Sequence, residues 1–165
     1  MELDKFDHAI LAALQRDARA SIQAISEQVG LSSTPCWNRI KRMEREGVIQ
    51  GYTVRVDPHA VGFAEQVIVQ VTLESHTEDT LDAFARELAA IPEVLEAELI
   101  SGDYDYLLRI AVRDTRDYER LLREKLYRIP GIRHSKSSFV LRTLKDEQLP
   151  LAPPAPPRKA RARRT

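Results

Sequence analysis

The chain has 165 residues, enough for one domain or two small ones, and its 43% apolar and 30% charged residues are typical of a soluble protein. Its 25 basic and 25 acidic residues cancel, and a net charge of zero by itself argues against a protein that binds nucleic acid or acidic membranes. The single cysteine, Cys36, excludes an internal disulfide framework and any multi-cysteine metal site, and it fits a reduced, cytoplasmic setting. We see neither an apolar run near the roughly 18 residues of a membrane span nor a secretory signal, so no membrane partner is expected.

The net charge of zero is a sum over three unlike segments. Residues 1–50 carry seven basic and seven acidic residues, whereas residues 51–149 carry 13 basic and 18 acidic ones. Residues 150–165 carry five basic residues, no acidic residue and five of the nine prolines. We therefore expect residues 147–165 to form a disordered, Pro-rich basic tail, which either adds nonspecific attraction to phosphates or only keeps the protein soluble.

Apolar residues at helical spacing predict three short helices in the first 50 residues. The first covers residues 4–16, the second ends at Gly30, and the third has Pro35 in its first turn and ends at Gly47. The candidate N-caps are Asp4, Ser21 and, for the third helix, Ser32, Ser33 or Thr34. Two short helices joined by a tight glycine-bearing turn form a helix-turn-helix, so residues 1–50 are predicted to be a DNA-binding domain.

The third helix has one apolar face and one polar, basic face. Cys36, Ile40 and Met43 share a face that is predicted to lie in the core. In a helix-turn-helix the second helix enters the major groove, where Asn pairs with adenine and Arg with guanine, while cations and a helix N-terminus bind phosphates. The candidate DNA-binding residues are Ser32, Ser33, Thr34, Trp37, Asn38, Lys41, Arg42 and Arg45.

The sequence also allows an interpretation in which the third helix does not bind DNA. Its basic face would then only contact solvent, and Trp37 would pack partly against a neighbouring helix instead of reading DNA. Arg39 is either a DNA contact or an ion-pair partner of a nearby Glu.

The rest of the chain alternates strands and helices in the order β-α-β-β-α-β. Residues 51–58 favour a short strand and a hinge, so residues 51–62 are interpreted as a linker. Strands are expected at 67–73, 94–100, 104–112 and around 139–141, and helices at 78–90 and around 118–126. Ile91-Pro92-Glu93-Val94 and Ile129-Pro130-Gly131-Ile132 each follow a helix and open a strand, as two half-repeats would. The fold class is therefore α+β: a winged-helix-like helix-turn-helix domain, then a ferredoxin-like βαββαβ domain over 63–146.

Two helices can cover only one face of a four-stranded sheet. We expect the other face to carry many apolar residues and to be buried by self-association.

These motifs together resemble the leucine-responsive regulatory protein/AsnC (Lrp/AsnC, feast/famine) transcription regulators. The opening Leu3-Asp4-Lys5-Phe6-Asp7 and the helix-turn-helix segments Val29–Ser32, Arg39–Glu44 and Gly47–Ile49 are similar to the family's. Gly102-Asp103-Tyr104-Asp105 matches the family's turn in the ligand domain, and Ile129–Ile132 matches the approach to its last strand. The resemblance covers residues 2–146 in the right order, and Met43 stands where Leu is usual.

The resemblance implies a regulator that binds double-stranded DNA as a homodimer, with octamers as a further assembly, and that responds to an amino-acid effector. A carboxylate would bind the ammonium of the effector, and the N–H groups of the glycine turn would bind its carboxylate. The candidate effector-binding residues are Gly102, Asp103, Tyr104, Asp105, Ser135 and Ser137. Without the family, the same turn is a plain β-hairpin, and Tyr104 and Tyr106 are residues that pack in an interface.

Other classes of function have little support in the sequence. Four scattered histidines share no motif, and the chain lacks a Walker-type loop, a paired-cysteine motif and HExxH, so we expect no enzyme. Asp103 and Asp105 lack a further ligand at a recognisable spacing, so we expect no metal site, and no cofactor beyond the amino-acid effector. An effector-independent protein that organises DNA, or an interaction protein, is the alternative to the regulator.

Overall fold

The computed structural model describes residues 2–147 and 149–151, and these residues fall into two compact units. The first, here the reading unit, comprises the described residues up to Val54 together with those from Lys145 onward; the second, the ligand unit, spans Arg55–Leu144. The predicted tail lies almost entirely outside the described residues, and the predicted domain limits at 50, 62 and 146 stay predictions.

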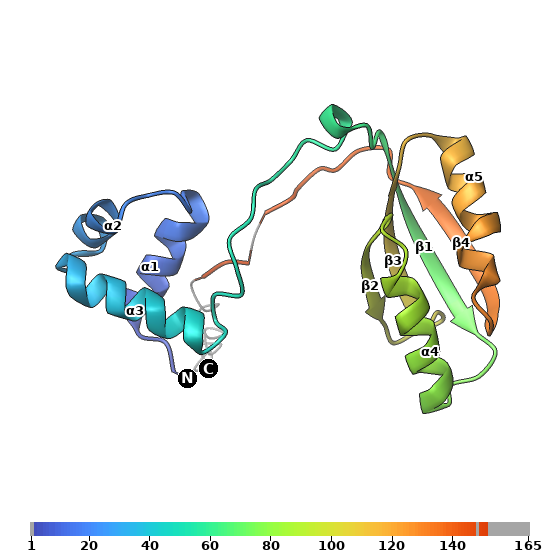
Figure 1. The fold of residues 1–165 in the computed structure, drawn as a ribbon, viewed down its shortest axis with the longest axis horizontal. Coiled ribbons are helices and arrows are strands. Elements are labelled where there is room, and N and C mark those ends of the chain that lie inside the picture. Colours follow the sequence, from blue (N-terminus) through green and yellow to red (C-terminus); the bar gives the residue numbers. More distant parts are fainter. Residues whose placement is uncertain (1, 148, 152–165) are drawn as a thin grey trace, which may run out of the picture. The chain divides into compact units, whose positions relative to one another are not determined.

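Three helices form the reading unit: α1 (Lys5–Arg16), α2 (Ile22–Val29) and α3 (Ser33–Arg45) (Figure 1). Local chemistry fixes their ends as predicted. The Asp4 and Ser21 side chains accept N–H bonds at the starts of α1 and α2, and Gly30 ends α2 at φ 72°. Ser32 is the N-cap of α3 by backbone position, although its hydroxyl makes no capping bond.

The core of the reading unit contains the apolar faces of all three helices. Cys36, Ile40 and Met43 of α3 are buried, as predicted. They pack with Ile10 and Ala13 of α1 and with Ile25 of α2. The exposed side of α3 is thereby set by the burial of its opposite side.

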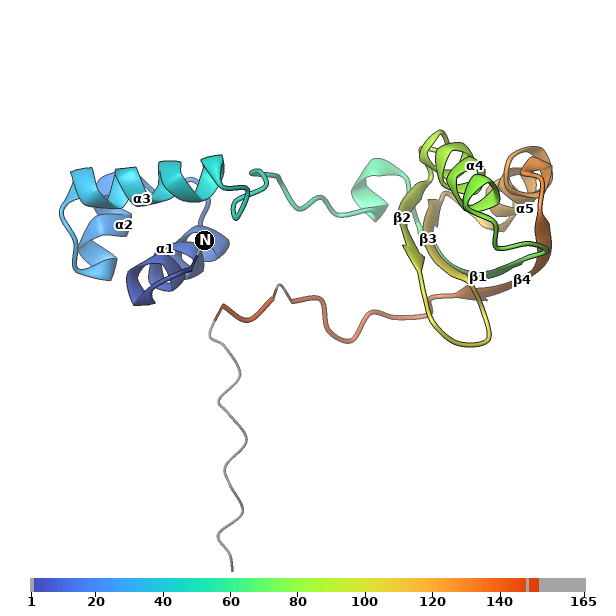
Figure 2. The ribbon, with the colours of Figure 1, turned by 90° about the horizontal axis from the view of Figure 1, so that it is seen from below.

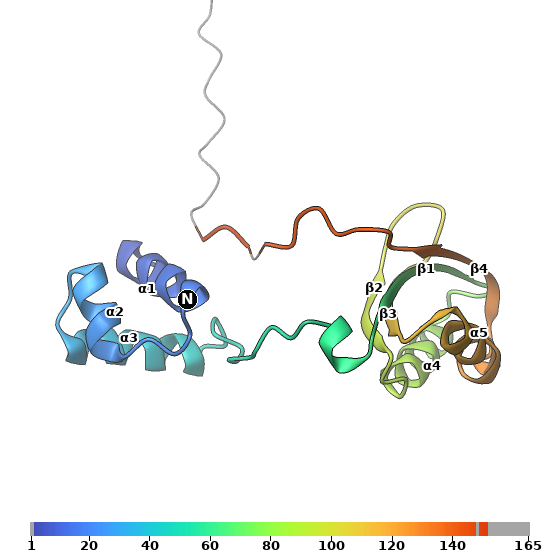
Figure 3. The same cartoon turned by 90° about the horizontal axis from the view of Figure 1, so that it is seen from above.

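The ligand unit has the predicted βαββαβ order. Its elements are β1 (Glu65–Leu73), α4 (Glu78–Ala89), β2 (Val94–Leu99), β3 (Tyr106–Val112), α5 (Thr115–Glu124) and β4 (Ile132–Phe139), with short 3-10 turns η1 (His59–Val61) and η2 (Leu126–Arg128). All strand pairs are antiparallel, in the order β2-β3-β1-β4, which is the ferredoxin-like arrangement. Figures 2 and 3 show both helices on the same side of this sheet.

The core lies between the sheet and these two helices. Val67, Val69 and Val71 of β1 and Leu108 of β3 are fully buried there, and Phe84 of α4 packs on Tyr106 with ring centroids 4.8 Å apart. Tyr106 is therefore a core residue, and its interpretation as an interface residue is wrong. The predicted half-repeat is confirmed: Ile91 and Ile129 are both buried where a helix leads into a strand.

The face of the sheet away from the helices differs from the expectation. Burial and register place only Ile68, Leu107 and Ala111 there as apolar residues of the inner strands. Around them lie polar and charged side chains, namely Gln66, Gln70, Thr72, Glu96, Glu98, Arg109, His134, Lys136 and Ser138. Fewer apolar residues than expected lie on this face, because Val67, Val69 and Val71 all belong to the helix side.

The short strand predicted over residues 51–58 is absent. Residues 51–57 form no ladder, and Tyr52, Val54 and Val56 are exposed. The alternating pattern is real, but a strand exists only where a second strand supplies its hydrogen bonds, and none of the described residues does so here.

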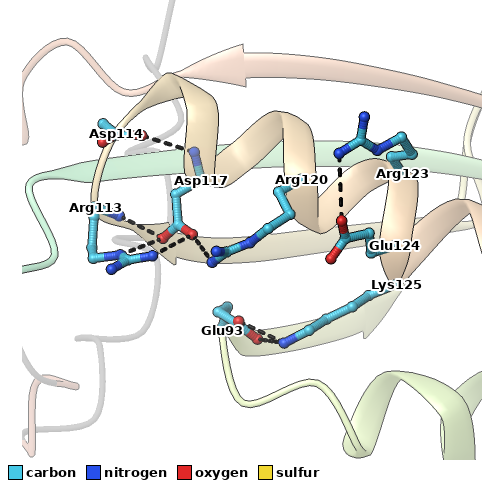
Figure 4. Close-up of polar contacts among 8 residues, drawn as sticks. All are labelled: Glu93, Arg113, Asp114, Asp117, Arg120, Arg123, Glu124 and Lys125. Atoms are coloured by element: carbon cyan, nitrogen blue, oxygen red, sulfur yellow. Dashed lines mark hydrogen bonds and ion pairs between the residues drawn. The ribbon is translucent and has the colours of Figure 1, made fainter.

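An ion pair ties the end of α5 to the start of β2. Lys125 Nζ lies 2.6 and 2.7 Å from the two carboxylate oxygens of Glu93 (Figure 4). Because Glu93 and Lys125 belong to different half-repeats, this pair joins the two half-repeats of the domain.

Candidate DNA-reading helix and effector site

The predicted DNA-binding residues lie together on α3. Ser32, Ser33, Thr34, Trp37, Asn38, Lys41 and Arg45 are all exposed, and Trp37 retains 48% of its accessible surface. Ser33 Oγ lies 3.3 Å from Ser26 Oγ of α2, so this hydroxyl also joins the two helices of the motif. The exposed face thus combines an indole, an amide and cations at the N-terminal half and middle of the helix, as groove recognition requires.

Two arginines of α3 are turned toward α1 rather than outward. Asp7 of α1 is buried, and its carboxylate accepts hydrogen bonds from Arg39 Nη1 at 2.8 Å and from Arg42 Nη2 at 2.7 Å. Arg39 Nη1 also donates to Asp4 at 2.8 Å. Of the two alternatives for Arg39, the structure therefore favours the ion pair over the DNA contact. Its partners are Asp4 and Asp7 and not the expected Glu.

This cluster has a clear electrostatic logic. A carboxylate buried without partners would be costly, and two arginines together with the Asp4 N–H group satisfy Asp7. The bonds to Asp7 and Asp4 raise the pKa of Arg39, so its charge is permanent. Arg42 is half-buried, and it stays a predicted DNA contact only through the donors that Asp7 leaves free.

The remaining cations of α3 have acidic neighbours on the surface. Lys41 Nζ lies 2.7 Å from Glu44 Oε2, and Arg45 lies 3.3 Å from Glu46. Such exposed pairs are weak and are readily exchanged for a phosphate. The polar face of α3 therefore keeps its capacity to bind an anionic duplex.

The predicted effector turn connects β2 to β3. Gly102 has a φ of 129°, Asp103 is exposed, and Tyr104 is half-buried. Asp105 is held firmly: its carboxylate accepts from the Leu73 N–H group at 2.7 Å and contacts His76 Nε2 at 2.8 Å. The bond to Leu73 is the main cause that lowers the pKa of Asp105. Asp105 is therefore already used to fasten the turn to the end of β1.

The predicted serines lie on the other side of β1. Val71 is paired with Ser135 of β4, while its carbonyl accepts the Asp105 N–H group at 2.9 Å. Asp105 and Ser135 are thus two strand spacings apart, about 10 Å. Ser137 contacts the hydroxyl of Tyr118 on α5, so it lies under the helices and away from the turn.

A shallow pocket of about 510 Å³ opens at the start of β4. It is lined by Tyr127, Ile129, Pro130, Gly131, Ile132, Arg133, His134 and Ser135. Ser135 is the one predicted effector residue in this lining, and its hydroxyl lies 3.2 Å from the Tyr127 hydroxyl. The Glu74 N–H group donates to the Gly131 carbonyl at 2.8 Å, which places this pocket at the same end of β1 as Asp105.

The structure adds polar groups that sequence reasoning missed. His76, Tyr127, Arg133 and His134 all lie at this end of the sheet. No spacing rule could have found His76, since it is 29 residues from Asp105 and lies in an exposed loop. Register alone could have found Arg133 and His134, which follow the glycine turn into β4.

Comparison with known proteins now assigns the family. Residues 66–150 match the family described as the Lrp/AsnC ligand binding domain, and residues 3–50 match winged helix-turn-helix DNA-binding domains. The chain belongs to the Lrp/AsnC family. This Lrp/AsnC protein is a transcriptional regulator with a helix-turn-helix unit and a ligand-binding unit.

Individual relatives agree along nearly the whole chain. The leucine-responsive regulatory protein of Escherichia coli (strain K12) is 40% identical to this Lrp/AsnC regulator over 144 residues, which are 87% of this chain and 88% of that protein. A Neisseria meningitidis transcriptional regulator in complex with L-methionine has a TM-score of 0.86 at 32% identity, covering 91% of this chain and 97% of the other. An AsnC family regulator from Agrobacterium tumefaciens has a TM-score of 0.85 at 37% identity, covering 90% and 97%.

These relatives carry the names of transcriptional regulators rather than enzymes. In the part of the chain that the structure describes, no three His, Cys, Asp or Glu side chains gather so as to hold a metal ion. Within the same residues, no helix has both the length and the apolar composition needed to cross a membrane.

Proposed function

We propose that this regulator binds operator DNA through the exposed face of α3 and that an α-amino acid bound by the ligand unit changes that binding. The observation that carries the proposal is the division of α3 into three faces. Its apolar face is buried, Arg39 and Arg42 are turned to Asp7, and Trp37, Asn38 and Lys41 remain exposed for the groove. A regulator of transcription acts where the chromosome is, so the proposal places the protein in the cytoplasm.

The proposed effector site is the end of the sheet that holds the Gly102–Asp105 turn and the pocket at the start of β4. Because Asp105 is engaged by Leu73 and His76, Asp103 is the better acceptor for the ammonium of the effector. Arg133 is a cation of the pocket that suits a carboxylate. Two similar regulators, from Neisseria meningitidis and Mycobacterium tuberculosis, were solved as complexes with L-methionine, so this is the first compound to test, and L-leucine is the second.

The active form is proposed to be a homodimer, with an octamer as a further assembly. Exposed apolar side chains in the ligand unit and its flanking segments support a second copy: Val54, Val56, Leu95, Leu99, Leu141 and Leu144. A single chain leaves these groups in water, whereas an isologous interface would bury them.

One set of binding measurements tests this proposal. Fluorescence anisotropy measures the affinity for two DNA fragments. The regulator should bind the DNA upstream of its own gene more tightly than it binds an unrelated fragment. Asn38→Ala should lower that preference about 5- to 100-fold, because alanine cannot form a bidentate pair with a base edge. L-methionine or L-leucine, but not D-methionine, should change the affinity for the operator. Equal binding to both fragments would favour the alternative, a protein that organises DNA without an effector.

A further inference from the structure

Tyr52 follows α3 and lies two residues before Val54, where the first segment of the reading unit ends. Its hydroxyl donates to Glu44 Oε1 on α3 at 3.0 Å. The chain between them is held against the helix, since the N–H groups of Val48 and Ile49 donate to the Met43 carbonyl at 2.9 and 3.1 Å. These bonds hold the chain next to α3 as far as Ile49, three residues before Tyr52.

Glu44 divides its two carboxylate oxygens between two donors. Oε1 accepts the Tyr52 hydroxyl, and Oε2 lies 2.7 Å from Lys41 Nζ. The bond from Lys41, followed by that from Tyr52, lowers the pKa of Glu44, so the carboxylate is charged at neutral pH. Tyr52, Glu44 and Lys41 are thus linked from the segment that follows α3 to the exposed face of this helix.

Lys41 binds a phosphate most strongly when it leaves Glu44, because the carboxylate partly neutralises the charge of the ammonium. The Tyr52 hydroxyl donates to the same carboxylate that holds Lys41, and this hydrogen bond draws part of the negative charge of Glu44 away from the ammonium. Without that hydroxyl, the carboxylate has one donor fewer and attracts Lys41 more strongly, so the pair is broken at greater cost when DNA arrives. A carboxylate that remains beside the phosphate also repels it.

We propose that Tyr52 and Glu44 are positioning residues that set how readily Lys41 is released to DNA: Glu44 restrains the lysine, and the Tyr52 hydroxyl weakens that restraint. This inference rests on the proposed DNA-binding function. It goes further by naming two residues outside the predicted contact set that tune the affinity.

A double-mutant cycle on the full-length protein tests the inference. Operator affinity is measured by fluorescence anisotropy at several salt concentrations for the wild type, Tyr52→Phe, Glu44→Gln and the double variant. Glu44→Gln should bind ~3- to 10-fold more tightly, and the slope of log K against log [salt] should steepen by up to about 0.9, because Lys41 then releases one more counterion. Tyr52→Phe should bind ~2- to 3-fold more weakly.

The double variant should bind like Glu44→Gln alone, because Tyr52 acts only through Glu44. Thr53→Val is the matched control: it removes a hydroxyl of the next residue, which contacts the neighbouring Val54 carbonyl, and should leave the affinity unchanged. Trp37 fluorescence in urea checks that each variant is folded.

The outcomes distinguish a failure of the proposed function from a failure of the inference on Tyr52. If the wild type shows no preference for the operator, both the proposed function and this inference are wrong. If the wild type binds the operator but Tyr52→Phe has no effect, or has the same effect in the Glu44→Gln background, only the inference on Tyr52 is overturned.

Discussion

At the scale of single residues, partners that lie far away in the sequence decide how far two charged side chains, Arg42 and Asp105, are free to bind a ligand. Asp7 meets Arg39 and Arg42, which are 32 and 35 residues away. Asp105 meets the backbone of Leu73, 32 residues away. In both cases the partner engages a charge that the sequence places among the ligand-binding groups: Arg42 keeps only the N–H donors that Asp7 leaves free, and Asp105 is bonded to the Leu73 N–H group.

Asp117 at the start of α5 gives a residue-scale prediction for acid stability. Its carboxylate accepts from Arg113 Nε at 3.1 Å and Nη2 at 3.0 Å and also contacts Arg120 (Figure 4). These bonds, those from the Arg113 side chain first, lower the pKa of Asp117 from 3.8 to about 2. Between about pH 4 and about pH 2 the unfolded chain therefore binds more protons than the folded one, and stability falls as the pH falls.

Asp117→Asn should remove this part of the acid dependence. The variant should be less stable than the wild type at pH 7, and the difference should shrink as the pH falls from 4 to 2. Urea titrations followed by circular dichroism at several pH values measure both curves. Because both arginines are half exposed or more, 1 M NaCl should reduce the difference at pH 7. If the free energy of unfolding of the two proteins changed in the same way between pH 4 and pH 2, the prediction would be contradicted.

At the scale of elements, the local stop and start signals determine the helix-turn-helix. Gly30 adopts a φ of 72°, and the following Leu31 N–H group donates back to the Ser26 carbonyl at 2.9 Å. Gly30→Ala should lower the free energy of unfolding of the reading unit by about 1–2 kcal/mol, since a left-handed Ala is strained even though its Cβ meets no atom within 4 Å.

Urea unfolding followed by Trp37 fluorescence measures that effect. The midpoint should fall, while the dependence of the free energy of unfolding on urea concentration stays unchanged. Gly30→Asn should cost less than Gly30→Ala, because Asn tolerates the left-handed conformation. Gly51→Ala is the matched control, because Gly51 has no left-handed φ and equally free space around it. A loss of stability at Gly51 as large as at Gly30 would show that the backbone conformation is not the cause.

At the scale of the whole molecule, the net charge of zero conceals segments of opposite sign. Residues 150–165 carry five cations and no acid. Deleting them should reduce the slope of log K against log [salt] for DNA by about 0.9 for each phosphate that the tail neutralises in the full-length protein. Anisotropy titrations on operator and unrelated DNA measure the slope. Full-length protein with the five cations replaced by Gln separates charge from chain length, and an unchanged slope would leave the tail a solubilising role.

Most of the fold follows from the sequence by itself. The caps at Asp4 and Ser21, the stop at Gly30 and the alternation of β1 are local signals, because a cap or a period depends only on neighbouring residues. The βαββαβ order and the exposed face of α3 follow from these signals, since each apolar stripe must be buried.

Tertiary structure alone decided which polar groups are free to act. It turned Arg39 and Arg42 toward Asp7, used Asp105 to close the turn, and joined Tyr52 to Lys41 through Glu44. It also left residues 51–57 without a strand partner, although their pattern alternates. The physical reason is the same throughout: a periodic pattern states which side of an element is buried, but a hydrogen bond or ion pair depends on what packing brings opposite each donor and acceptor.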